Sequence, residues 1–125
     1  MAITHTTTVR NALANLIDDQ VNSGTTDANG DLVIMTSGDV EVATLALSNP
    51  AFGAASSGTI TAASITDDTS ATGGTAALFK FQNRDNTEVF RGSGGTSGAD
   101  LNLSSTSIGA GDTVQVTSFT YSAPA

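Results

Sequence analysis

The sequence predicts a mainly β protein: an antiparallel β-sandwich or jelly-roll-like barrel with one N-terminal amphipathic α-helix. Thr, Ser, Ala and Gly fill more than half of the 125 positions, and small and β-branched residues suit thin β-layers joined by tight turns. From residue 31 onward, apolar and polar residues alternate, and turn residues recur about every eight to twelve positions, as in sandwiches and barrels. Helical spacing is confined to the segment before residue 24.

The length favours a single domain spanning residues 1–125. Within it we expect three parts. An extended N-terminal arm covers residues 1–8, a helix covers residues 8–23, and a β-sandwich body covers residues 31–122.

The helix is predicted from "TTTVRNALANLIDDQVNSG", in which apolar residues recur at spacings of three and four. This stripe consists of Val9, Ala12, Leu13, Leu16, Ile17 and Val21. Thr7 or Thr8 can cap the start of the helix. Because a helix this short is not stable alone, we expect it to pack on a surface, where it either plugs one open end of the sandwich or barrel or lies outside it.

Seven later segments alternate as strands do. They cover residues 31–37, 40–48, 58–66, 75–82, 87–91, 99–105 and 112–122. In "TAALFKFQ" the alternation points Phe79 and Phe81 inward, and the four-residue turn that follows places Phe90 opposite one of them. The glycine-rich stretch "GSGGTSG", residues 92–98, is interpreted as a connector.

Charge and hydropathy argue against several classes of partner. The net charge is −8, and eight carboxylates separate Arg10 from Lys80 with no intervening base. An acidic surface repels phosphate backbones, so we expect no nucleic-acid partner. No apolar run approaches the roughly 18 residues that a membrane span needs, so we expect no membrane partner. The N-terminal sequence also lacks the pattern of a secretory signal.

No motif indicates an enzyme, a metal site or a cofactor. His5 is the single histidine, and it lies among threonines before the helix rather than in a catalytic motif. The "DANGD" stretch at residues 27–31 lacks the closing Glu of a calcium loop and is better explained as an Asn-Gly turn. The "GSGGTSGAD" stretch lacks the lysine and the helix of a phosphate-binding loop.

Two features suggest contact with a partner. The arm residues Ile3, Thr4, Thr6 and Thr7 could add a strand to a partner's sheet. In the uncharged stretch "SNPAFGAASSGTITAASI", residues 48–65, small side chains let backbones approach closely, and Phe52 is the only large residue. Phe52 either anchors in a neighbour's pocket or packs in its own core.

Three stretches together resemble a group of small proteins that tailed bacteriophages encode near their head and tail genes. They are "TTTVRNALANLIDDQVNSG", "ATLALSNPAFGAASSGTITAASIT" and "GTSGADLNLSSTSIGAGDTVQVTSFTY". The resemblance implies a non-enzymatic capsid decoration (cement) protein that binds the major capsid protein on the capsid exterior as a homo-oligomer, a dimer or trimer, after synthesis in the host cytoplasm. The alternative is a small tail component or a fibre-like adhesin. The resemblance carries over no functional residues.

Overall fold

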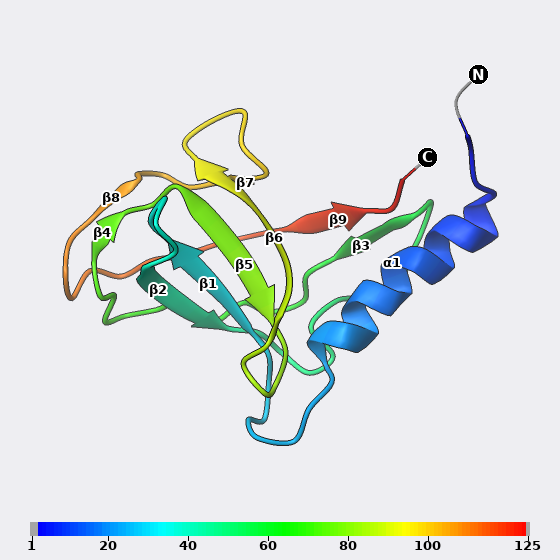
Figure 1. The fold of residues 1–125 in the computed structure, drawn as a ribbon, viewed down its shortest axis with the longest axis horizontal. Helices are drawn as coiled ribbons and strands as arrows, with labels where there is room; N and C mark the ends of the chain where they lie inside the picture. The colour runs from blue at the N-terminus through cyan, green and yellow to red at the C-terminus, as the bar shows by residue number, and fades with distance from the viewer. Residues whose placement is uncertain (1–2, 125) are drawn as a thin grey trace.

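The computed structural model describes residues 3–124, and Figure 1 shows one helix followed by strands. Helix α1 spans Thr7–Val21. The strands are β1 (Asp31–Met35), β2 (Glu41–Ala46), β3 (Thr59–Thr61), β4 (Gly74–Thr75), β5 (Leu78–Gln82), β6 (Glu88–Gly95), β7 (Leu101–Asn102), β8 (Ser107–Ile108) and β9 (Thr120–Ser122). The predicted fold class, mainly β with one N-terminal helix, is confirmed.

Five strands form one curled, half-barrel sheet in the order β2-β1-β5-β6-β7. The first four strands pair antiparallel, as predicted, whereas β6 and β7 run parallel. Two short antiparallel ribbons, β3-β9 and β4-β8, complete the body. Strand β8 was not predicted, and β4 was not separated from the predicted strand at residues 75–82, because two residues are too few to show an alternation.

The centre of the core is aromatic, and the predicted strand pairing builds it. Phe79 and Phe81 are buried, and Phe90 lies directly opposite Phe81 in the register of β5 and β6. The rings of Phe81 and Phe90 stack with centroids 4.7 Å apart and planes inclined by 12°. The ring of Phe119, from the C-terminal segment, lies 4.8 Å from that of Phe81. This aromatic group joins the sheet to the β3-β9 ribbon.

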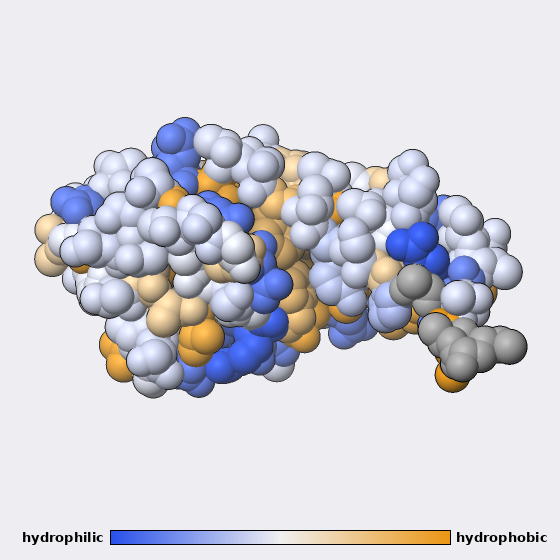
Figure 2. Space-filling model, turned by 90° about the horizontal axis from the view of Figure 1, so that it is seen from above, coloured by the Kyte–Doolittle hydropathy of each residue, from blue (hydrophilic) through white to orange (hydrophobic). Residues whose placement is uncertain are grey.

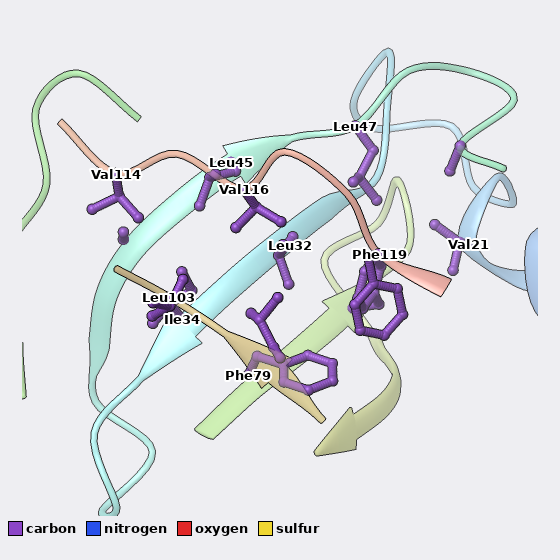
Figure 3. Close-up of a cluster of buried hydrophobic side chains, with 14 of the residues drawn as sticks. Val21, Leu32, Ile34, Leu45, Leu47, Phe79, Leu103, Val114, Val116 and Phe119 are labelled. Carbon is purple, nitrogen blue, oxygen red and sulfur yellow. The ribbon is translucent and has the colours of Figure 1, made fainter. Parts of the chain in front are cut away.

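The C-terminal segment crosses one face of the sheet without joining it. Val114, Val116 and Phe119 are all buried there. Figure 3 shows the valines on the side of β1 and β2, and the ring of Phe119 contacts those of Phe79 and Phe81 in β5. The predicted strand 112–122 becomes regular only at Thr120. The step from residue 116 to 119 breaks the two-residue period, so Phe119 faces the core together with the valines and not opposite them.

Strand β6 runs on through part of the predicted glycine-rich connector and ends at Gly95. Packing explains the glycine at position 92. A Cβ atom on Gly92 would lie 2.7 Å from Cε1 of Phe79 and 2.9 Å from Oδ2 of Asp100. The interpretation of residues 92–98 as a plain connector is therefore wrong for residues 92–95.

The N-terminal boundaries also differ from the prediction. The helix begins at Thr7, and the Thr6 hydroxyl caps it by accepting a hydrogen bond from the N–H of Val9 over 3.2 Å. Thr7 therefore belongs to the helix and not to the extended arm. The described part of the arm is residues 3–6, and residues 1–2 of the predicted arm lie outside the described residues.

Candidate functional site

The apolar stripe of the helix largely faces solvent. Val9, Leu13 and Leu16 are 43%, 36% and 50% exposed. We call these three residues the outer helix face. Val21 is fully buried and Ile17 is partly buried, so only the C-terminal end of the predicted stripe reaches the core. Most of the stripe therefore does not attach the helix to the body.

A polar seam attaches the helix instead. It consists of the side chains of Asn11, Asn15, Asp18 and Asn22, spaced by four, three and four residues on one side of α1. Each accepts a hydrogen bond from the same stretch of chain. Their Oδ1 atoms accept hydrogen bonds from the backbone N–H groups of Gly58, Ala55, Phe52 and Ala51 over 2.8, 3.0, 3.0 and 2.8 Å.

The polar seam explains the composition of residues 51–58. This stretch lies on the helix with its backbone, so bulky side chains would hold the two apart. Gly58 shows the tightest approach, because a Cβ atom there would lie 2.7 Å from Cζ of Arg10, and its φ of +76° also favours glycine. The glycine at position 58 therefore serves close approach within one chain.

Phe52 lies in its own core. It is 2% exposed, and its ring centroid lies 5.6 Å from that of Phe81 and 6.5 Å from that of Phe119. Of the two alternatives for Phe52, the structure shows the core position and not the anchor in a neighbour's pocket. The physical reason is the hydrogen bond from its N–H to Asp18, which holds the backbone against the helix while the ring turns inward.

The remaining predicted contact residues are on the surface. Ile3, Thr4 and Thr6 are exposed, and Ile3 is 85% exposed, the highest value among the large apolar residues described. Together with the outer helix face, Ile3 makes the N-terminal part of the molecule rich in exposed apolar side chains. Sequence patterns alone did not distinguish this surface from a core-facing stripe, because both have helical spacing.

A cleft between β6 and β9 was not predicted from the sequence. Its volume is about 300 Å³, and the rings of Phe79, Phe90, Phe119 and Tyr121 line it together with Arg91, Asp100 and neighbouring backbone. In Figure 2, which views the molecule from above, a band of hydrophobic surface crosses between the rounded sheet end and the helix end. The cleft arises because β6 and β9 belong to different sheets and do not pair.

Charged groups surround Arg91 at the edge of this cleft. Its guanidinium contacts Asp39 at 3.0 Å and Glu88 at 2.8 Å. The hydrogen bonds from Arg91 lower the pKa of both carboxyl groups and raise the pKa of the guanidinium. Asp100 accepts hydrogen bonds from the backbone N–H and the hydroxyl of Ser93. Arg91 is paired with Asp39 and Glu88, and Asp100 is hydrogen-bonded to Ser93. Such paired groups are typical of a structural network.

Within residues 3–124, no three His, Asp or Glu side chains gather as a metal site requires. Over the same range, no helix combines the length and the apolar character needed to cross a bilayer. No family model, curated protein or solved structure matches this chain.

Proposed function

We propose that this chain is a non-enzymatic structural protein of a phage virion, and specifically a capsid decoration protein. It would bind the outside of the major capsid protein shell and stabilise the head. The resemblance of three stretches to small phage proteins supports the choice of a virion component. The surface of the molecule supports a binding role.

The observation that carries the binding role is the exposed outer helix face. Val9, Leu13 and Leu16 stand at spacings of four and three and are open to solvent, while the polar seam on the opposite side of the helix accepts hydrogen bonds from the body. Burial of apolar surface contributes about 25 cal/mol per Å². A partner that covers this face therefore gains the stabilisation that folding of the chain itself leaves unused.

A decoration protein of this kind would act by mass action. A protein that binds the assembled shell, and not the free or damaged subunits, stabilises the shell by RT ln(1 + [L]/Kd). The acidic surface, with a net charge of −8, fits a partner with basic exposed groups and disfavours contact with the packaged nucleic acid.

The experiment mixes the purified chain with expanded empty heads and measures co-sedimentation and the melting temperature of the heads. We expect saturable binding and a higher melting temperature. The double variant Leu13→Ser, Leu16→Ser should lose both effects. Val40→Ser is the matched control, because Val40 is 62% exposed but lies in the turn between β1 and β2. It should bind as the native chain does.

Two results would overturn the proposal. The native chain could fail to bind heads, or the double variant could saturate them as the native chain does. Binding to host cells without binding to heads would favour the alternative, a tail component or fibre-like adhesin.

A further inference from the structure

We propose that the cleft between β6 and β9 accepts the N-terminal arm, residues 3–6, of a second copy of this chain as an added strand. The two strands that border the cleft each have one unpaired edge. Strand β6 pairs with β5 along its length but with β7 only at Gly94 and Gly95. Strand β9 pairs with β3 alone.

On the β6 side, the backbone of Arg91 points into the cleft. The N–H of Gly94 donates to the carbonyl oxygen of Ala77, toward β5. The N–H of Ser93 donates to Asp100 on the opposite side. Because backbone direction alternates along an antiparallel strand, Arg91 faces the same side as Ser93. Arg91 also lines the cleft.

On the β9 side, Thr120 and Ser122 supply the open backbone groups. The carbonyl oxygen of Phe119 accepts from Ala62, and the N–H of Ala123 donates to Gly58, so both residues face β3. The same alternation turns the backbone groups of Thr120 and Ser122 away from β3. Both residues line the cleft. An extended segment there would therefore find hydrogen-bonding partners, which is the basis of strand addition.

The floor of the cleft suits an apolar side chain. The rings of Phe90 and Tyr121 are half-buried, with centroids 5.4 Å apart, and Phe79 and Phe119 lie behind them. Strand addition gains affinity from main-chain hydrogen bonds and specificity from pockets that take alternate side chains. A strand with one apolar side chain packed on these rings, and polar residues on either side of it, would supply both the main-chain hydrogen bonds and the side-chain contact.

The arm has the matching chemistry. Ile3 is 85% exposed, Thr6 has extended dihedral angles of −66° and 159°, and Ile3, Thr4 and Thr6 are β-branched, as strands prefer. The first carboxylate of the chain is Asp18, so the arm carries no negative charge. The cleft edge carries Asp39, Glu88 and Asp100 against Arg91 and Lys80, so an arm without carboxylates meets no like-charge repulsion there.

The donor is a second copy because the arm leaves its own body. Figure 1 shows the N-terminal segment leading away from the sheet and beyond the start of α1, and the exposure of Ile3 agrees with this. Copies that exchange identical arms form a closed symmetric oligomer, either a dimer or a ring. The proposal does not rest on the assignment to a capsid.

The absence of cysteine makes cross-linking a direct test. Full-length chains carrying Thr4→Cys are mixed with chains carrying Thr120→Cys and oxidised. We expect a disulfide-linked dimer of the two variants. Ser105→Cys replaces Thr120→Cys in the control, because Ser105 is equally exposed but lies outside the cleft. We expect at least tenfold less cross-linked product in the control.

A second measurement uses the mass of the full chain by light scattering and amide hydrogen exchange. We expect an oligomer in which the N–H groups of Arg91, Thr120 and Ser122 exchange at least tenfold more slowly than in the variant Ile3→Asp, which should be monomeric. Val40→Asp, the control, should remain oligomeric and protected.

The following results would overturn the proposal: a monomer at all concentrations, an oligomer that survives Ile3→Asp with unchanged protection, or a disulfide within one monomer carrying both Thr4→Cys and Thr120→Cys. Failure to bind heads by an otherwise intact oligomer would instead count against the proposed function alone.

Discussion

The carboxylate of Asp18 accepts a hydrogen bond over 3.0 Å from the backbone N–H of Phe52, the residue whose ring packs in the aromatic core. The same Oδ1 atom accepts from the side-chain amide of Asn22 over 2.9 Å, and Asn22 in turn accepts from the N–H of Ala51. This chain of contacts joins the end of helix α1 to the core through polar atoms. Its energetic importance depends on how deeply each N–H group is buried.

We therefore expect Asn22→Ala to destabilise the protein more than Asn15→Ala does. Ala51 is fully buried, so its N–H would lose its partner without gaining water, at a cost of about 1–3 kcal/mol. The N–H that Asn15 accepts, from Ala55, lies at an exposed site where water can replace the side chain. Urea unfolding of both variants measures the difference, and equal losses would contradict this explanation.

We expect Phe52→Ala to lower the free energy of unfolding by about 3–5 kcal/mol, the range for truncating a buried aromatic residue. Phe52→Leu should cost less, because it retains part of the buried volume. Denaturant unfolding gives both values. If Phe52→Ala were neutral for stability and instead abolished binding to a partner, the core position of Phe52 would be refuted.

Two glycines of β6 provide a matched pair. Gly92→Ala should destabilise by about 1–3 kcal/mol, because the added methyl group would meet the ring of Phe79 and the carboxylate of Asp100 at less than 3 Å. Gly94→Ala should be tolerated, because its nearest neighbouring atoms would lie at 3.8 Å, an ordinary contact distance. Thermal unfolding of the two variants tests this, and an equal effect of both would argue that backbone entropy, and not packing, selects glycine here.

Asp85 should give the protein an acid-sensitive contact. The N–H groups of Thr25 and Thr26 donate to its carboxylate and lower its pKa below the ordinary value of 3.8. A lowered pKa in the folded state stabilises the fold above the unfolded pKa, and this contribution disappears as the pH falls through the folded pKa. Denaturation midpoints between pH 7 and pH 2 should therefore fall less steeply for Asp85→Ala than for the native chain. An unchanged slope would exclude this contact as a cause.

Asp31 should have the opposite effect on the pH dependence of stability, because its pKa is raised. Burial raises its pKa above 3.8, against the hydrogen bond from Gln82, and the charges of Asp27 and Glu41 add to the rise. Its charged form therefore destabilises the fold at neutral pH, and that cost is relieved as the pH falls through the raised pKa toward the unfolded value. We expect Asp31→Asn to be more stable than the native chain at pH 7 and to lose this advantage near pH 3. Lower stability at pH 7 would show that the contact with Gln82 outweighs burial.

Local patterns were sufficient for the strands that border the central turn. The alternation in residues 75–82 and the length of the turn placed Phe79 and Phe81 inward and Phe90 opposite one of them. The irregularity between Phe81 and Gln82 in the pairing of β5 with β6 accompanies the register in which that partner is Phe81, and the sequence pattern did not show it. Local patterns were insufficient for residues 112–119, where one irregular step returned Phe119 to the core.

The orientation of helix α1 shows most clearly what sequence periodicity cannot predict. Residues 11, 15, 18 and 22 have helical spacing, and so do residues 9, 13 and 16. Periodicity predicts that the helix has an apolar side and a polar side, but it does not predict which side contacts the body. Backbone N–H groups of residues 51–58 needed acceptors once they lay against the helix, and this need selected the polar side.

The amino-acid sequence by itself determined the fold class, the existence of the helix and the inward direction of the central phenylalanines, because these depend on contacts near in sequence or on strict alternation. Only the tertiary structure decided which helix face stays exposed, where Phe52 lies and that two unpaired strand edges border one cleft. These depend on which distant segments meet, and the hydrogen-bonding needs of a backbone become known only when its neighbours are known.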